Sequence, residues 1–251
     1  MIEHINFRRV MAFLCLSACS ILFTCFLGFY QKMYTDDWYC MFLIDAIFVM
    51  IFIFELEFGR SKAQFAENRN SYFVKYVIAF LVCSIISGVF ATLPLFAKPV
   101  MIIPIIILSV SNEVTAFLSG IYFTALLSLT VSGDYYELLG DIIVLILGIV
   151  IMQVIFMQKI KIFAYTIIFC FNIVIPVVFY YLEYRESSIK PTIYGFVCGV
   201  VSVVAAIVCE KYVKPYADSE VNHYLMDLIC DDYALLREIK NDSSNEYDHA
   251  R

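Results

Sequence analysis

The amino-acid sequence predicts an all-α membrane protein: a polytopic bundle of about eight transmembrane helices, with seven possible, followed by a short cytoplasmic amphipathic helix. Three observations predict this class. Hydrophobic residues make up 62% of the 251 residues and charged residues only 16%, whereas a soluble domain carries about 25% charge. The apolar residues stand in long blocks separated by short polar breaks. After residue 214 the long blocks end, and apolar and charged residues alternate at helical spacing.

Each apolar block is close to the length that crosses a bilayer, since a transmembrane helix needs roughly 20 residues and about 17 suffice. The fourth and fifth blocks are joined only by Ser111-Asn112-Glu113, which must form a tight hairpin. In chain order, the predicted spans are 10–30, 38–54, 72–93, 95–111, 114–132, 141–157, 160–182 and 192–210.

Basic residues predict the orientation of these spans. With the N-terminus inside, ten Lys and Arg residues near the spans fall on the cytoplasmic face and four on the outer face, as the positive-inside rule requires. An even number of spans places both termini in the cytoplasm of a multi-pass protein of the cell membrane. The cytoplasmic set is Arg8, Arg9, Arg60, Lys62, Arg69, Lys75, Lys159, Lys161, Lys211 and Lys214, and the outer set is Lys32, Lys98, Arg185 and Lys190.

Composition also limits the partners. The lipid bilayer is the partner that so much apolar surface requires. Nucleic acid is excluded as a partner, because no basic cluster is longer than a pair. No Cys-x-x-Cys pair occurs, so we expect no cofactor to be bound by this chain and the cysteines to be free thiols.

Polar residues inside the spans are the first candidates for a ligand or sensor site, because they are rare at membrane depth. Asp45 lies about two turns from the outer end of the second span, so it is either a ligand or proton site or a carboxyl group near the outer surface. For Gln153 and Asn172, hydrogen bonding across helices is the simpler alternative to a ligand site. Gly195 and Gly199 have the spacing that lets two helices approach closely.

The residues after the eighth span predict a connector and the start of another domain. Residues 218–240 repeat apolar side chains at three- and four-residue steps, which predicts an amphipathic helix. Ser243 and Glu246 then have the spacing of a capping box, so a new helix begins near Ser244. We therefore expect a transmembrane bundle at 1–210, a cytoplasmic connector at 211–243, and the start of a truncated HD-like domain at 244–251.

The eighth span and its tail resemble the membrane-to-cytoplasm junction of the seven-transmembrane HD phosphohydrolase receptors. In that family a glycine-bearing last span ends in an acidic residue, as at Glu210. A Leu-x-x-Leu element and a Pro-Leu-Leu-Arg element follow, and then Pro-Gly-Thr-Tyr-His-His-Ser opens the HD domain. The similar segments here are Leu225-Met226-Asp227-Leu228, Ala234-Leu235-Leu236-Arg237-Glu238 and Asn245-Glu246-Tyr247-Asp248-His249-Ala250. The resemblance covers about residues 95–251.

The resemblance implies a metal-dependent phosphodiesterase that cleaves cyclic di-AMP and uses a divalent metal pair, Fe or Mn, in its HD domain. His249 falls on the first metal ligand of the family motif. Glu246, Asp248 and Ala250 depart from that motif, and the 251 residues contain no His-Asp dyad and no later ligands. We therefore expect a membrane sensor and anchor, without catalytic residues of its own, that relays a signal through residues 211–240 to an HD domain. Cyclic di-AMP would bind only through that domain, and family analogy suggests a homodimer.

Two other functions remain open from the sequence. One is a small-molecule or ion transporter that uses Asp45 and the prolines at the start of the fourth span, Pro94, Pro99 and Pro104. The other is a membrane scaffold that recruits partners through its cytoplasmic tail.

Overall fold

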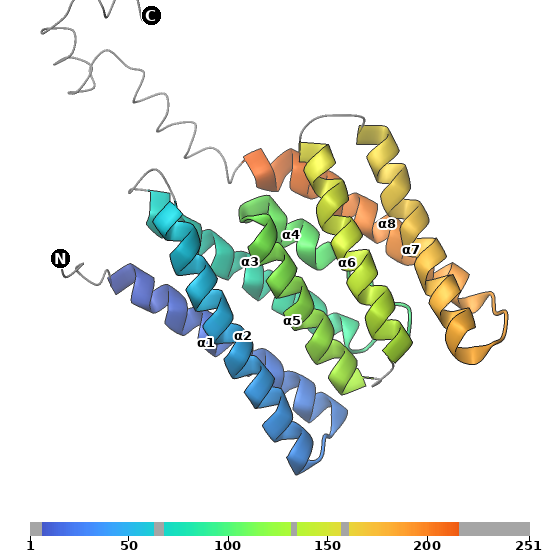
Figure 1. Cartoon of the computed structure of the whole chain (residues 1–251), viewed down its shortest axis with the longest axis horizontal. Helices are drawn as coiled ribbons and strands as arrows, with labels where there is room; N and C mark the ends of the chain where they lie inside the picture. Colours follow the sequence, from blue (N-terminus) through green and yellow to red (C-terminus); the bar gives the residue numbers. More distant parts are fainter. Residues whose placement is uncertain (1–6, 63–67, 132–134, 157–160, 216–251) are drawn as a thin grey trace, which may run out of the picture. The chain divides into compact units, whose positions relative to one another are not determined.

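The computed structural model describes residues 7–62, 68–131, 135–156 and 161–215 (Figure 1). The chain divides into two compact units, Met1–Lys214 and Pro215–Arg251. Most of the predicted connector, the predicted domain start at 244–251 and His249 lie outside the described residues. The elements are α1 (Phe7–Gln31), α2 (Thr35–Lys62), α3 (Asn68–Phe90), α4 (Ile102–Val110), α5 (Glu113–Val131), α6 (Tyr135–Phe156), α7 (Lys161–Tyr184), α8 (Lys190–Val208) and the π-helix η1 (Cys209–Val213).

The predicted class, a helical bundle of a polytopic membrane protein, is confirmed. The described ranges contain only helices and their connections, and seven of the helices are long and apolar enough to span a membrane. These seven are α1, α2, α3, α5, α6, α7 and α8. The sixth predicted span was wrong at its start, because α6 begins at Tyr135 and not at residue 141. The extra turns bring Glu137 into the helix, where it is buried, and place Asp141 one turn after it instead of at the first position.

The fourth predicted span, 95–111, is not a continuous helix. α4 has nine residues, which extend about 13.5 Å, less than half of a hydrocarbon layer of about 30 Å. Residues 91–101 before it are turns and irregular backbone. Pro94 and Pro99 explain the break, because proline lacks the N–H that a helix needs and clashes with the preceding turn. Phe96 adds a left-handed backbone conformation, with φ of 61°.

The broken segment still connects the two ends of the bundle. At one end, the Gln31 side chain of α1 donates a hydrogen bond to the Ala91 carbonyl, 3.5 Å away. At the other end, the Asn112 amide donates to Glu55 Oε1 of α2 over 3.3 Å. Residues 91–112 therefore cross the bundle as irregular backbone followed by a half-length helix. The first residues of α1 and the last of α8 consequently lie at the same end (Figure 1). That this end is cytoplasmic stays a prediction.

The tight hairpin predicted at Ser111-Asn112-Glu113 is confirmed. α4 ends at Val110 and α5 begins at Glu113. Asn112 Oδ1 accepts the backbone N–H of Thr115 over 2.7 Å, which caps the new helix.

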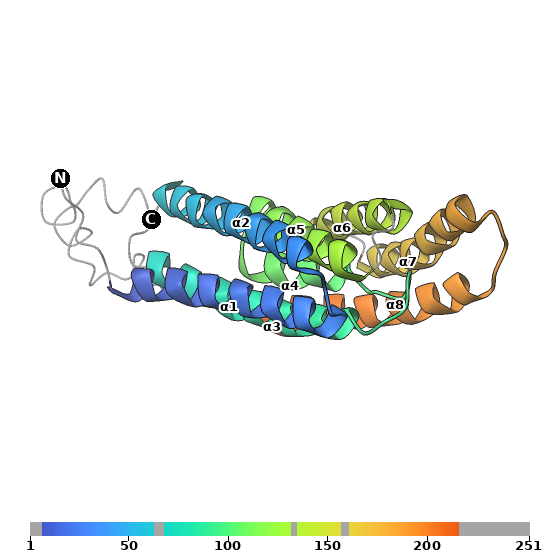
Figure 2. The same ribbon diagram turned by 90° about the horizontal axis from the view of Figure 1, so that it is seen from below.

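α4 lies in the interior of the bundle (Figure 2). It packs against α3, α5, α6 and α8, and seven of its nine residues are buried. A helix that is apolar on every side is stable only where protein surrounds it or lipid does. Irregular backbone at membrane depth likewise requires protein or a water-filled cavity around it. A functional site is therefore expected close to residues 91–101.

Candidate functional site

The irregular segment carries a lysine into the protein interior. Lys98 Nζ lies 3.1 Å from Glu137 Oε1 of α6, and the two side chains are only 1% and 2% exposed. The same carboxylate oxygen accepts the backbone N–H of Phe96 over 2.9 Å. Phe96 is held further by an edge-to-face contact between its ring and that of Tyr180 in α7, with centroids 5.8 Å apart. One carboxylate thus anchors the irregular backbone to α6.

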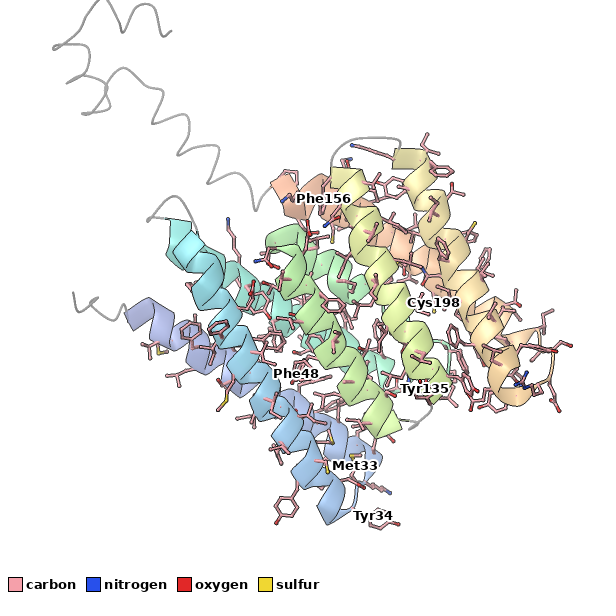
Figure 3. The ribbon with its side chains drawn as sticks, viewed as in Figure 1. Met33, Tyr34, Phe48, Tyr135, Phe156 and Cys198 are labelled. Atoms are coloured by element: carbon pink, nitrogen blue, oxygen red, sulfur yellow. The ribbon has the colours of Figure 1, made fainter. Side chains whose placement is uncertain are left out.

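A small cavity of about 20 Å³ adjoins this ion pair, enough space for roughly one water molecule. α6 contributes two carboxyl groups to its lining, Glu137 and, one helical turn later, Asp141. α7 contributes Asn172, and α8 contributes Cys198, which faces the bundle interior (Figure 3). The site therefore collects two carboxyl groups, one ammonium group, one amide and one thiol from four parts of the chain.

The charges of this site do not balance. Lys98 pairs with Glu137. Asp141 lies within electrostatic range of both, yet forms neither an ion pair nor a hydrogen bond with any residue that the structure describes. With all three groups ionised, the described residues of the site carry one negative charge more than they carry positive charge. Such a charge is costly at membrane depth unless something neutralises it.

Of the residues chosen from sequence, Asn172 belongs to this site. It is 3% exposed, and its Nδ2 donates to the Ile168 carbonyl over 2.8 Å and to Met101 Sδ over 3.4 Å. The bond to Met101 crosses to the residue before α4, as expected. Gln153 is half-buried and makes no hydrogen bond within the described ranges, so the cross-helix bond expected of it is absent there.

Asp45 lies elsewhere, among α1, α2 and α5, and is only 3% exposed. Asp45 is thus enclosed by the bundle, and both of its alternatives, a ligand or proton site and a carboxyl group near the outer surface, stay predictions. Asp45 Oδ1 accepts the hydroxyl of Tyr122 over 2.8 Å. Aromatic rings surround that tyrosine, including Phe48, whose ring makes an edge-to-face contact with centroids 5.5 Å apart. A buried carboxyl group with a hydrogen-bond donor in an aromatic cluster acts well as a packing anchor.

The far end of α7 and α8 holds a second charged contact. Glu210, in η1, forms an ion pair with Lys161 at the start of α7 and accepts the hydroxyl of Tyr165 over 2.6 Å. A π-helix is rare, and where it interrupts an α-helix it often marks a functional position. Here it stands where α8 leaves the bundle.

Sequence reasoning missed Lys98, Glu137 and Asp141. Lys98 was assigned to the outer face near the start of the fourth span, Glu137 to an outer loop, and Asp141 to the first residue of a span. Two signals could have found them: a lysine between two prolines in an apolar stretch, and two carboxyl residues four positions apart, which share one face of a helix.

No family model, curated protein or solved structure matches the chain. The described ranges also contain no group of three or more His, Cys, Asp and Glu residues arranged to hold a metal ion. The resemblance to the HD phosphohydrolase receptors therefore stays a prediction.

Proposed function

We propose that this chain is the membrane sensor and anchor of a metal-dependent phosphohydrolase of the seven-transmembrane HD type. In this proposal the helices relay a signal to a cytoplasmic HD domain that hydrolyses cyclic di-AMP with a divalent metal pair. The resemblance of residues 195–250 supports the identity of the recipient domain. His249 would be its first metal ligand.

The observation that carries the relay is the contact between α7 and α8, the most extensive helix pair of the bundle. Both helices line the cavity, through Asn172 and Cys198. Both also meet at the exit of α8, where Glu210 contacts Lys161 and Tyr165. Along either helix the two places are about 16–18 Å apart at 1.5 Å per residue. A change at the cavity that moves α8 against α7 would therefore change the contacts of Glu210.

The first test reads the coding sequence beyond Arg251. An in-frame HD domain with a His-Asp dyad supports the proposal. A stop codon with no downstream HD reading frame contradicts the connection to an enzyme.

Given such a domain, we expect Glu210→Gln in the full-length protein to change the basal rate of cyclic di-AMP hydrolysis in membranes by roughly fivefold or more, the usual size of an allosteric coupling. Tyr165→Phe should change the rate in the same direction, because it removes a contact to the same carboxylate. Glu186→Gln, at an exposed position of the α7–α8 turn, is the control and should leave the rate unchanged. Opposite effects of the first two variants, or no effect, contradict the relay.

A specific observation also favours a second candidate, a small-molecule or ion transporter. Broken helices that expose backbone near a buried charge are typical of transporter binding sites, and residues 91–110 combine a break with the Lys98–Glu137 pair. The structure thus favours the broken crossing over Asp45 as the transport site. Proteoliposomes should then take up a radiolabelled ion or small solute, Glu137→Gln should abolish uptake, and Asp45→Asn should preserve it. Absence of uptake across a panel of inorganic ions and amino acids contradicts this candidate.

A further inference from the structure

We infer that the cavity beside the Lys98–Glu137 pair is a binding site for one small monovalent cation, held by the carboxylate of Asp141 and the amide oxygen of Asn172. The inference does not depend on the relay proposed above. It follows from charge, from an unused acceptor and from the size of the cavity.

The charge argument begins with Glu137. Lys98 Nζ and the Phe96 N–H both approach its Oε1, at 3.1 and 2.9 Å, so the ionised form of Glu137 is well supported inside the protein. The negative charge of Glu137 thereby balances the single positive charge of Lys98. Asp141 lines the same cavity and has neither an ion pair nor a hydrogen bond in the part of the chain that the structure describes. One carboxylate without a counter-charge matches the charge of one monovalent cation, whereas divalent ions usually take several carboxylate ligands.

Asn172 supplies the second, independent observation. Its Nδ2 donates both of the hydrogen bonds that the residue makes, to the Ile168 carbonyl and to Met101 Sδ. Turning the amide over would place two oxygens against each other at Ile168, so this orientation is the favourable one. The amide oxygen then has no donor among the described residues, although the side chain is only 3% exposed. An unused oxygen acceptor on the wall of a cavity is a suitable ligand for a hard cation.

The dimensions agree with one bare ion. The cavity volume of about 20 Å³ is enough for roughly one water-sized occupant and too small for an organic solute. The thiol of Cys198 is the remaining polar group of the cavity wall. Both oxygen ligands come from transmembrane helices, α6 and α7, so a bound cation would join these two helices across the cavity.

The test uses the whole chain purified in detergent, with thermal unfolding followed in sodium, potassium and choline chloride at constant total chloride. Binding to the folded state alone raises the melting temperature in a saturable way. We expect wild type and Asp45→Asn to show such a rise with sodium relative to choline, and Asp141→Asn to show none. Asn172→Ala should need a sodium concentration roughly 10- to 100-fold higher for the same rise, the effect of losing one contact to a charge.

A second measurement covers the case in which a variant does not fold. Radioactive sodium should bind the wild-type protein saturably, and unlabelled sodium should displace it while choline does not. Equal melting temperatures of wild type in all three salts, or absence of saturable sodium binding, overturns the inference. So does a sodium response that persists in Asp141→Asn. If acidification raises the melting temperature but neither sodium nor potassium does, a proton occupies the carboxylate, and the cation site is likewise overturned.

Discussion

Lys98→Met is expected to destabilise the folded bundle by about 3–5 kcal/mol, the usual loss when one partner of a buried ion pair is removed. The loss arises because the carboxylate partner of Lys98 remains buried after the substitution. Glu137 is 2% exposed, so its carboxylate would stay in the interior with the Phe96 N–H but without its counter-charge. Asp141 would add a second negative charge nearby. Unfolding in mixed micelles of rising dodecyl sulfate content, followed by the fluorescence of Trp38, measures the loss.

Two further variants make this result specific. Lys98→Met combined with Glu137→Gln removes both charges and keeps an oxygen acceptor for the Phe96 N–H, so it should recover most of the loss, because no unpaired charge then remains buried. Lys190→Met removes an exposed lysine at the start of α8 and should change stability by less than about 0.5 kcal/mol. An unchanged stability of Lys98→Met, or a double variant as unstable as the single one, would show that the pair does not hold the irregular segment.

The transmembrane helices were predictable because the length of an apolar block must match the thickness of the hydrocarbon layer that it crosses. An apolar block of some 20 residues has few alternatives to crossing lipid as a helix. The α4–α5 hairpin was predictable for a different reason: its cap is local, since Asn112 bonds to Thr115 three positions later. Both features depend on neighbours in the sequence.

The broken crossing was not predictable from the same signal. Hydrophobicity over 95–111 is compatible with a full helix and with a short helix after buried irregular backbone. Pro94 and Pro99 were visible, yet proline also occurs within intact transmembrane helices, as Pro176 does within α7. What distinguishes the two cases is a distant partner for the freed backbone. The Phe96 N–H finds that partner in Glu137, 41 positions away.

The candidate site was hidden for the same reason. From the sequence, Lys98 is a charge at the outer start of the fourth span and Glu137 is a charge in the loop before the sixth, because the sequence reveals no partner for either. Their pairing depends on how α6 packs against the segment before α4, which no local pattern encodes. Asn172 was found from sequence because a single amide in the middle of a span is unusual by itself.

Gly195→Ala is expected to destabilise the bundle by about 1–3 kcal/mol, the cost of overpacking a tight contact. A Cβ at Gly195 would lie 2.6 Å from the Asn172 carbonyl oxygen and 2.8 Å from Ile173 Cα. Both atoms belong to the backbone of α7, so a rotamer change cannot relieve the clash, and the two helices must separate. Alanine also favours helix over glycine by about 1 kcal/mol, so a net loss means that the clash outweighs this gain.

Two other glycines supply matched comparisons in the same unfolding measurement. At Gly88 the nearest atom to a new Cβ is Phe26 Cε1, at 3.2 Å, which is the edge of a ring that can turn, so Gly88→Ala should be neutral or stabilising. At Gly199 the neighbours are Phe169 Cδ2 at 2.9 Å and the Phe169 carbonyl oxygen at 3.1 Å, which predicts an intermediate loss. The order Gly195, Gly199, Gly88 of decreasing loss follows from how much backbone each Cβ meets. A loss in Gly195→Ala no larger than that in Gly88→Ala would mean that α8 moves away from α7 at little cost, and a contact that yields so easily could not carry a change at the cavity to Glu210.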